Sequence, residues 1–579
     1  MSRGQLVPRA AALLTRRGML RSSALGGLGW LLGTKASLAI PKPQIAPVVQ
    51  TTAGAVHGYV QGSVFTFKGI PYGASTAGLN RFVPPRKPHS WGGIRPALRY
   101  GPTAMQPIFH PAPRASPNDA EISELYRGLG ASPPNPESED CLVLNVWTAS
   151  VTDDHRRPVM VWLHGAGFGA GSGDWGWTDG TNLACHHDVV VVSINHRLNI
   201  FGFLSLAEIG GDQYAQSGNV GMLDVVAALQ WVRDNITAFG GDPRNVTIFG
   251  QSGGGVKVDV LMAMPLAQGL FHRAINMSGP CTKMLTQAQA TQAAERVLDY
   301  LGIHRAHLDR LQRLPAQTLV QAMDHVLLAD GITPADGTWR DGTWLHVFDP
   351  VVDGLVLPRH PFDPDAPAAS AQVPMLLGTA GEDSRLDAGL DSSFISPVDT
   401  PDEEAMYANL KGLGIEGERA VDLVKVYRAT RSHATAADIF SAIASDLEFR
   451  RDIIAIAERK SRLGKAPVYL YDFSWASPAF GGKYGSAHGF DQAFAFSNLD
   501  KAPGLWGGHP DPRGYELARR MSKAWVAFAR TGNPNHPGLP EWRPYTEKDR
   551  ATMVLNYSCE LASDPRKEDR RAIDGLHPA

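Results

Sequence analysis

Short apolar segments separated by turn residues are the first pattern along the chain. Residues 142–147, 159–163 and 189–194 are predominantly apolar, as is typical of sheet strands that are covered on both faces. By contrast, residues 223–236 carry apolar side chains at helical spacing and lead into a turn sequence at 239–243. This alternation of strands and helices predicts an α/β protein with a mostly parallel, doubly wound central sheet.

Two segments before these strands have the pattern of a β-hairpin. Residues 51–58 and 64–72 alternate between apolar and polar side chains and are bounded by glycine and proline. They predict an antiparallel edge of the sheet. A proline-rich connection follows from Pro84 to Pro136, with one potential helix at 120–127. We expect this connection to lie on the surface and to overhang a pocket.

The segment 245–255 joins an apolar strand to a Gly-x-Ser-x-Gly turn with Ser252 at its apex. Such a sharp turn between a strand and a helix holds the serine hydroxyl out of the sheet as a nucleophile. The motif alone is weak evidence, because the glycine and serine content of the chain predicts about 0.4 chance matches. It therefore needs partners elsewhere in the sequence.

A glycine-rich loop at 164–168 supplies the first potential partner. It follows the strand predicted at 159–163, and its backbone N–H groups could point at a carbonyl group held above Ser252. Acyl transfer needs such donors because negative charge builds on the carbonyl oxygen, and one donor contributes about 3 to 4 kcal/mol. The alternative interpretation is an ordinary glycine-rich turn.

Composition and charge exclude several classes of protein. The chain has 579 residues, of which 43% are hydrophobic and 19% charged, and this composition excludes a disordered or fibrous protein. The net charge of -2 comes without a basic stripe or an acidic run. We therefore expect neither a nucleic-acid partner nor steering of a strongly charged substrate.

Residues 1–39 have the features of a targeting segment. Arg16 and Arg17 precede an apolar stretch at 24–32, and small residues follow at 37–39. The segment resembles a bacterial twin-arginine export signal, which implies a periplasmic or secreted protein. Because the apolar stretch is too short and too rich in glycine to span a membrane well, no stable membrane anchoring is expected. Residues 40–579 are predicted to form a single domain.

Cysteines are too sparse to form a disulfide scaffold in a chain of this length. Proteins exported by the twin-arginine route resemble one another in folding before export, in a reducing compartment. We therefore predict mostly buried thiols for the four cysteines, which are Cys141, Cys185, Cys281 and Cys559.

Several further motifs give the chain a clear resemblance to the type-B carboxylesterase/lipase family of α/β hydrolases, which includes bacterial para-nitrobenzyl esterases and the cholinesterases. The resemblance extends over residues 44–557 and implies the α/β-hydrolase fold. Besides the strand and turn at 245–255, which form the nucleophile elbow, the matching segments are 67–72, 138–145, 161–168, 192–198, 201–205, 218–224, 239–243, 271–275 and 525–534.

The resemblance implies roles for the residues around the turn. Ser252 matches the nucleophile, and the oxyanion donors would be the backbone N–H groups of Ala166, Gly167 and Gly253. Many relatives have glycine in place of Ala166. Because only the N–H group is required, the additional methyl group should narrow the acyl side of the pocket without abolishing the oxyanion hole.

A histidine that follows Ser252 must serve as the general base, because the nucleophile, the acid and the histidine come in that order in this fold. The segment 483–492 matches the loop around the catalytic histidine of the family, which assigns this role to His488, with Asp491 at a position where glutamate is common. A neutral imidazole accepts the serine proton, so activity should fall as His488 is protonated below about pH 6 to 7.

The acid of the triad has two candidates. Relatives place a glutamate in the loop after a strand, and this chain has Glu382 followed by Asp383 after the strand predicted near Gly378. An ungapped alignment from Gly378 selects Asp383, whereas a deletion of one residue selects Glu382. Either carboxylate could accept the Nδ1–H of the histidine, and we favour Asp383.

Two other positions differ from the family pattern. Gln251 precedes the nucleophile where relatives commonly have glutamate, which removes a negative charge near the imidazolium and argues against choline esters as substrates. Met105 stands where many relatives have the cysteine that pairs with the residue matching Cys141. The resemblance therefore implies that this disulfide is absent.

Each of three further residues has two interpretations, one as part of the site and one as a purely structural residue. Ser278 matches a serine that lies near the triad in relatives, although it could simply be a turn serine. Trp175 and Trp177 could line an apolar gorge for aryl or acyl groups, or they could be packing residues.

Together these residues predict a serine carboxylic-ester hydrolase that forms an acyl-enzyme on small aryl or alkyl esters, without a metal or an organic cofactor. One alternative is a catalytically inactive, esterase-like binding module. Another is hydrolysis of carbamates, amides, feruloyl esters or polyesters. The ester, its chain length and the oligomeric state are not predicted, because they depend on the segments 84–136 and 331–346.

Overall fold

The computed structural model describes residues 44–106, 119–130, 135–329, 347–386 and 397–576. The chain divides into two units, Met1–Lys42 and Pro43–Ala579, and every described residue belongs to the second. The predicted export segment at 1–39 lies outside the described residues, as does the segment 331–346. The prediction of a single domain over 40–579 therefore remains a prediction.

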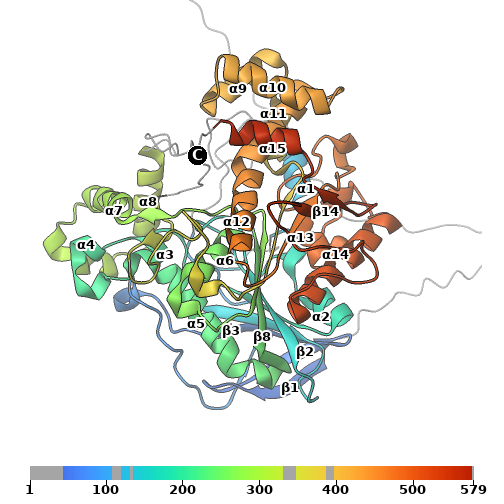
Figure 1. The fold of residues 1–579 in the computed structure, drawn as a ribbon. Coiled ribbons are helices and arrows are strands. Elements are labelled where there is room, and N and C mark those ends of the chain that lie inside the picture. The colour runs from blue at the N-terminus through green and yellow to red at the C-terminus, as the bar shows by residue number, and fades with distance from the viewer. Residues whose placement is uncertain (1–43, 107–118, 131–134, 330–346, 387–396, 577–579) are drawn as a thin grey trace, which may run out of the picture. The chain divides into compact units, whose positions relative to one another are not determined.

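A 13-stranded sheet forms the centre of the second unit (Figure 1). Its strands follow the order β1-β2-β3-β5-β7-β6-β8-β9-β12-β13-β14-β15, with β4 paired to β2. They are β1 Gln44–Gln50, β2 Ala55–Gln61, β3 Val64–Pro71, β4 Ile94–Pro96, β5 Val143–Thr148, β6 Arg157–Leu163, β7 Val190–Ile194, β8 Gly241–Gln251, β9 Arg273–Met277, β12 Met375–Ala380, β13 Val468–Phe473, β14 Ala551–Leu555 and β15 Glu560–Ser563. A separate pair joins β10 Leu285–Thr286 to β11 Val351–Val352.

The direction of pairing changes across the sheet. In sheet order, the strands from β7 through β6 to β14 pair in parallel. The pairings from β1 through β2, β3 and β5 to β7 are antiparallel, and so is that of β15 with β14. The predicted fold class, with a parallel centre and an antiparallel N-terminal edge, is therefore confirmed. The hairpin differs in detail, because residues 51–54 form the turn between β1 and β2 instead of belonging to a strand.

Helices cover the sheet and connect its strands (Figure 1). The helix predicted at 223–236 is present as α5. The α-helices are α1 Asp119–Leu125, α2 Thr181–His187, α3 Asn199–Phe203, α4 Ala207–Gly210, α5 Val220–Asn235, α6 Gly253–Ala263, α7 Gln287–Leu301, α8 Ala316–Ala329, α9 Glu403–Gly412, α10 Glu418–Thr430, α11 Ala436–Ser445, α12 Arg451–Arg462, α13 Asp491–Ala495, α14 Pro512–Thr531 and α15 Lys567–Asp574.

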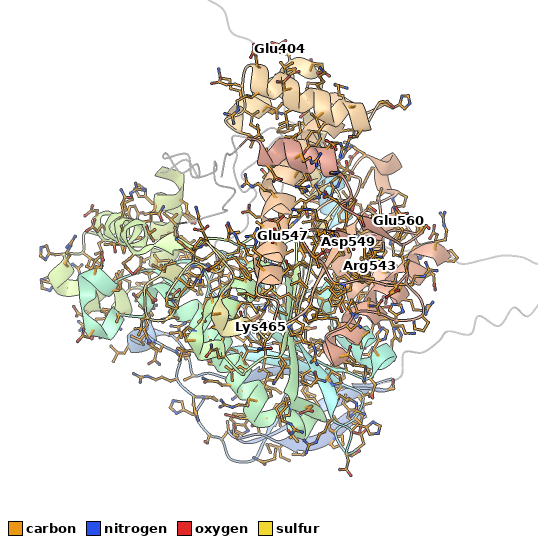
Figure 2. The ribbon with its side chains drawn as sticks, viewed as in Figure 1. Glu404, Lys465, Arg543, Glu547, Asp549 and Glu560 are labelled. Carbon is orange, nitrogen blue, oxygen red and sulfur yellow. The ribbon has the colours of Figure 1, made fainter. Side chains whose placement is uncertain are left out.

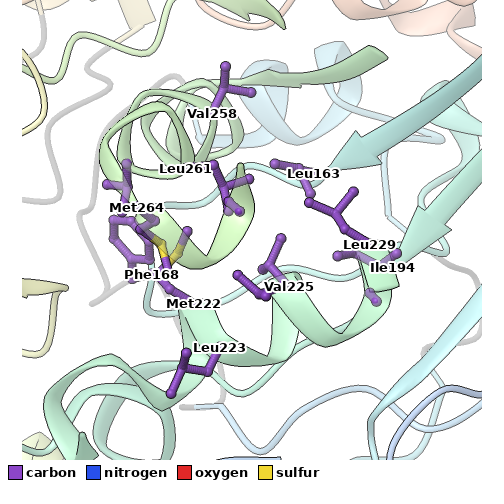
Figure 3. Close-up of a cluster of buried hydrophobic side chains, with 14 of the residues drawn as sticks. Leu163, Phe168, Ile194, Met222, Leu223, Val225, Leu229, Val258, Leu261 and Met264 are labelled. Carbon is purple, nitrogen blue, oxygen red and sulfur yellow. The ribbon is translucent and has the colours of Figure 1, made fainter. Parts of the chain in front are cut away.

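Side chains alternate between the two faces of the sheet and form two separate cores. In β6, Val161 and Leu163 belong to a cluster with residues of α5, α6 and α12, whereas Trp162 belongs to a cluster with residues of α2, α13 and α14. Figure 3 shows part of the first cluster, which includes Val258 and Leu261 of α6 and Val225 and Leu229 of α5. Helices thus cover both faces, and α6 is fixed against the carboxyl ends of the central strands.

Figure 2 labels charged side chains of both signs, including Lys465, Arg543 and Glu547. Arg543 pairs with Asp549 at 2.9 Å, and Glu547 pairs with Arg462 at 2.6 Å. Among the described helices, none is both long enough and apolar enough to cross a membrane. Within the same residues, no group of three or more His, Cys, Asp or Glu side chains is arranged to hold a metal ion.

All four cysteines are free thiols, but the prediction that they are mostly buried is only half right. Cys141 and Cys281 are buried, whereas Cys185 is exposed and Cys559 is partly exposed. Cys185 lies in the last turn of helix α2, and Cys559 lies in the connection between β14 and the edge strand β15. Cys559 packs at the margin of the core cluster that includes Met553 and Leu555, which covers it only in part.

Candidate active site

Ser252 is the single residue between β8 and α6. Its φ of 58° lies in the left-handed region that residues other than glycine rarely adopt. The N–H of Ser252 donates to the carbonyl of Met277 at 2.8 Å, and its own carbonyl accepts from the N–H of Val256 at 3.0 Å. The main chain is therefore held in a strained turn that presents the serine side chain at the start of a helix.

The glycines of this turn are required because other backbone segments pass close by. A Cβ atom on Gly254 would lie 2.0 Å from the carbonyl oxygen of Leu163, at the end of β6. A Cβ atom on Gly250 would lie 2.4 Å from the carbonyl carbon of Gly254. Side chains at these positions would push β6, β8 and α6 apart, so the motif reflects close packing of three main-chain segments.

Three backbone N–H groups lie beside Ser252. Ala166 and Gly167 both have positive φ angles, of 62° and 59°, and no described residue accepts a hydrogen bond from their N–H groups. The N–H of Gly253 is at the start of α6, where helices leave N–H groups without an internal partner. A Cβ atom on Gly253 would lie 2.4 Å from the nitrogen of Gly167, so the two segments are in contact. The three predicted oxyanion donors are therefore brought together.

Asp383 contacts the imidazole of His488. The carboxylate is fully buried at the start of a short 3-10 helix after β12, and its Oδ1 lies 2.8 Å from His488 Nδ1. Its Oδ2 accepts from the hydroxyl of Ser278 at 3.0 Å and from the N–H of Ala380 at 2.9 Å. This network holds the carboxylate in one orientation, and it places Ser278 in contact with the acid.

Glu382, the other candidate acid, points elsewhere. Its Oε1 lies 3.0 Å from Nη1 of Arg385, and its Oε2 accepts from the N–H of Ser486 at 3.3 Å. The guanidinium and this main-chain N–H hold Glu382 beside the loop that leads to His488, away from the imidazole nitrogens. Of the two adjacent acids, only Asp383 contacts the imidazole.

Gln251 contacts the same imidazole, and its Nε2 lies 3.4 Å from His488 Nδ1. Its Nε2 lies 3.0 Å from His488 Nε2, and its Oε1 accepts from Nε2 of Gln492 at 3.1 Å. When Nδ1–H of His488 donates to Asp383, Nε2 carries the lone pair that can accept a proton. Among the described residues, no hydrogen bond joins the Ser252 hydroxyl to His488. Nε2 must therefore approach the serine hydroxyl before it can accept the serine proton.

Two further carboxyl groups lie near this network. Burial, and then the charge of Asp383, raises the pKa of Asp491 to about 7, and burial chiefly raises the pKa of Glu448 to about 7 as well. Asp491 accepts from the hydroxyl of Tyr471 at 2.9 Å, and Glu448 accepts from the hydroxyl of Ser384. Near neutral pH these two carboxyls are therefore partly protonated, which reduces the negative charge around Asp383.

A cavity of about 330 Å³ opens above Ser252. Its walls are mostly apolar, and the larger side chains that line it are Tyr126, Leu129, Phe168, Trp175, Val256, Pro280 and Phe449. Trp175 thus belongs to the cavity, whereas Trp177 is fully buried and stacks on Tyr126 with 5.8 Å between ring centroids. Tyr126 and Leu129 come from the proline-rich connection, which was expected to overhang a pocket. Residues 107–118 and 131–134 of this connection lie outside the described residues.

Sequence reasoning did not identify the contact between Tyr126 and the histidine loop. The Tyr126 hydroxyl donates to the carbonyl of His488 at 2.9 Å, and the ring of Phe449 lies 4.9 Å from the imidazole. The one sequence feature that pointed to this region was the helix predicted at 120–127, which includes Tyr126.

A serine on a strained turn after a central parallel strand, backbone N–H groups beside it and a histidine paired with a buried acid define a class. The molecule is an α/β hydrolase with the parts of an acyl-transfer site.

Comparison with known proteins identifies the family. A profile of the carboxylesterase family matches residues 45–572. The para-nitrobenzyl esterase of Bacillus subtilis (strain 168) is 34% identical over 528 residues, which cover 91% of this chain and 98% of that protein. The phenmedipham hydrolase of Pseudarthrobacter oxydans is 31% identical over 539 residues, which cover 92% and 99% of the two chains.

A solved structure agrees with this match. The carboxylesterase of Geobacillus stearothermophilus aligns with a TM-score of 0.74 at 34% identity. The alignment covers 91% of this chain and 99% of the Geobacillus chain. The chain therefore belongs to the carboxylesterase family, and it is a carboxylic-ester hydrolase of the serine type. An inactive binding module is not favoured.

Proposed function

We propose that Ser252, His488 and Asp383 form the catalytic triad of this esterase, with the N–H groups of Ala166, Gly167 and Gly253 as its oxyanion hole. The observation that supports this most strongly is the distance of 2.8 Å between His488 Nδ1 and Asp383 Oδ1. His488 also lines the same cavity as Ser252. The nucleophile and the three residues of the oxyanion hole follow the ends of two neighbouring strands, β6 and β8.

The reaction begins when His488 Nε2 approaches the hydroxyl of Ser252 and accepts its proton. The Ser252 oxygen attacks the ester carbonyl, and the charge on the carbonyl oxygen is stabilised by the three N–H groups and by the N-terminus of α6. The imidazolium then gives its proton to the leaving alcohol, which departs. Water, activated by the same imidazole, hydrolyses the acyl-enzyme. Asp383 accepts the Nδ1–H bond throughout and fixes the tautomer.

The substrates are proposed to be uncharged esters with an aryl or alkyl group. The cavity walls are mostly apolar, and Gln251 brings an amide, not a carboxylate, to within 3.0 Å of the imidazole. Aromatic side chains such as Trp175 and Phe449 offer flat surfaces to an aryl ring. The named activity of the Bacillus relative, a para-nitrobenzyl esterase, is consistent with this class.

A substrate panel tests the proposal. We expect p-nitrophenyl butyrate and p-nitrobenzyl acetate to be hydrolysed with saturation kinetics, and butyrylcholine to be a much poorer substrate. Ser252→Ala should remove hydrolysis of all of them while the protein stays folded. Preferential turnover of a phenyl carbamate, a feruloyl ester or an anilide would instead assign a different substrate class.

We also propose that the protein is exported by the twin-arginine route. The support is the sequence of residues 1–39, with Arg16 and Arg17 before a short apolar stretch. In a bacterial host, the full chain should appear in the periplasmic fraction in processed form. The double change of Arg16 and Arg17 to lysine should retain the enzyme in the cytoplasm, and equal export of both forms would refute the route.

A further inference from the structure

A lysine lies fully buried behind the proposed oxyanion hole. Lys257 is in α6, five residues after Ser252, and its side chain has no exposed surface. Burying an ammonium group is costly unless other groups replace the water that it loses. Among the described residues, no carboxylate forms an ion pair with it. Its hydrogen-bond partners are main-chain carbonyls.

Three main-chain carbonyls surround the ammonium. Lys257 Nζ donates to the carbonyl of Gly167 at 2.6 Å, to that of His164 at 3.1 Å and to that of Gly253 at 3.4 Å. An ammonium has three N–H donors, so each one has an acceptor. Its charge is thus directed at backbone atoms of the two segments that supply the oxyanion donors.

The positions of these carbonyls matter for the donors. The N–H groups of Ala166 and Gly167 belong to two consecutive peptide groups. The carbonyl of His164 belongs to the peptide group just before these two, and the carbonyl of Gly167 belongs to the one just after them. The third carbonyl belongs to Gly253, whose own N–H is the third donor. One charged group therefore ties both ends of the loop 164–167 to the first turn of α6.

The loop side of this contact needs such a restraint. Ala166 has a φ of 62°, which is unfavourable for a residue with a Cβ atom, and Gly167 has little conformational preference of its own. The helix that carries Lys257 is well fixed, because Val258 and Leu261 belong to the same core cluster as Val225 of α5 (Figure 3). A rigid helix thus holds a strained loop.

We propose that Lys257 is a positioning residue for ester hydrolysis, whose ammonium fixes the loop 164–167 so that its N–H groups meet the oxyanion. This role rests on the proposed function of Ala166, Gly167 and Gly253. Lys257 does not touch the substrate. It acts through the peptide groups that it holds, and its positive charge lies on the side of the site where negative charge develops.

The surroundings of the ammonium favour this role. Burial lowers the pKa of Lys257 to about 7, and the negative charge of Asp349 opposes this shift. The imidazoles of His164 and His196, stacked at 5.0 Å, are the other titratable groups near it. Burial, followed by the charge of Lys257, lowers the pKa of both imidazoles, so they stay neutral. Lys257 is therefore the positive charge of this region below about pH 7.

The test compares Lys257→Met with a matched control, Lys460→Met. Lys460 is also buried, in α12, and its Nζ also donates to two main-chain carbonyls, those of Ser370 at 2.6 Å and Ala371 at 2.9 Å. It belongs to neither the catalytic site nor the cavity. Each variant is assayed for kcat and KM with p-nitrophenyl butyrate, for inhibition by an alkyl trifluoromethyl ketone, and for its thermal midpoint.

We expect Lys257→Met to lower kcat by about 10- to 100-fold, somewhat less than the loss of a donor itself, with little change in KM. The affinity for the trifluoromethyl ketone, which forms a tetrahedral adduct, should fall by a similar factor. Lys460→Met should change only the thermal midpoint. Equal kcat and equal inhibition in Lys257→Met and the wild type would overturn the proposal.

Two controls keep the result interpretable. If Lys257→Met does not fold, Lys257→Gln, which retains amide donors without the charge, is measured in the same way, and an unchanged kcat would overturn the proposal. Ser252→Ala is assayed in parallel. Activity in Ser252→Ala would refute the proposed catalytic function, whereas an active Lys257→Met beside an inactive Ser252→Ala would refute only the role of the lysine.

Discussion

The two halves of the proposed site differ in what positions their functional groups. The elbow half, residues 250–257 with 164–168, provides the nucleophile and the N–H groups from adjacent strand ends, β6 and β8. The histidine half, residues 378–386 with 483–492, provides an acid and a base from the segments after β12 and β13. Main-chain geometry dominates the first half, and hydrogen bonds between side chains dominate the second.

This difference determines what each half tolerates. In the elbow half, a Cβ atom on Gly254 would lie 2.0 Å from a carbonyl oxygen, so even the smallest side chain disturbs it. In the histidine half, Asp383 is held by the hydroxyl of Ser278 and by the N–H of Ala380, and His488 is held through its carbonyl by Tyr126. We therefore expect substitutions to change geometry in one half and charge or tautomer in the other.

The largest expected effect tests the histidine half. Asp383→Asn should lower kcat by about 10⁴-fold, because an amide no longer holds the Nδ1–H tautomer of His488. The neighbouring change Glu382→Gln is the matched control and should alter kcat only a few-fold, since Glu382 contacts Arg385 and the N–H of Ser486. Steady-state kinetics of both variants decide the assignment, and the reverse pattern would transfer the role to Glu382.

The second prediction tests the elbow half. Gly254→Ala should destabilise the protein by about 3 kcal/mol, the upper part of the range for overpacking, because the methyl group meets the carbonyl of Leu163. Turnover by the protein that still folds should fall on the order of 100-fold as the oxyanion donors are displaced. Thermal unfolding and kinetics measure the two effects.

A matched control for this change is Gly92→Ala, because an added Cβ atom at Gly92 meets no atom within 4 Å. It should leave stability and turnover nearly unchanged. If both alanine variants behave alike, the close approach of β6 and α6 is not what requires glycine at this position.

Dependence on pH separates the halves further. Burial lowers the pKa of Lys257 to about 7, so the ammonium is present below this pH and is lost above it. A neutral amine has two N–H donors and cannot hold three carbonyls. The wild-type kcat should therefore decline, about tenfold at most, as pH rises through this range. Lys257→Met should lack this alkaline decline, and identical pH profiles of the variant and the wild type would contradict the account.

The smallest expected effect concerns Gln251. In Gln251→Glu, a carboxylate would lie about where the amide now contacts His488 Nε2, and it would favour the imidazolium. The acid limb of the pH profile should move to higher pH, and kcat at neutral pH should fall only a few-fold. Gln251→Leu, which removes the polar contact without adding charge, serves as the control and should leave the acid limb in place.

The sequence predicted the elbow half better than the histidine half. The strand, the turn and the glycine-rich loop are short-range patterns, so β8, Ser252 and the segment 164–168 could be located without tertiary information. The strands β5, β6 and β7 and the helix α5 followed from apolar runs for the same reason. The family resemblance added His488, whose loop lies far from the elbow in the chain.

Features that depend on distant contacts could not be predicted in this way. Glu382 and Asp383 are adjacent acids, and only the position of Arg385 and of Ser278 distinguishes them in the fold. Lys257 has one signal in the sequence, a lysine between two valines in an otherwise buried helix. Nothing in the local pattern shows that its partners are main-chain carbonyls. Likewise, the strand β15 could not be predicted, because it pairs with β14 at the exposed edge of the sheet, where a strand needs no apolar pattern.

The central claim, that Ser252 is the nucleophile of a complete acyl-transfer site, is tested most directly by labelling with a p-nitrophenyl alkylphosphonate. The account predicts one covalent adduct per protein, mapped by mass spectrometry to Ser252, with loss of ester hydrolysis in proportion to labelling and no adduct in Ser252→Ala. Folded protein that hydrolyses p-nitrophenyl butyrate while Ser252 remains unlabelled would contradict it.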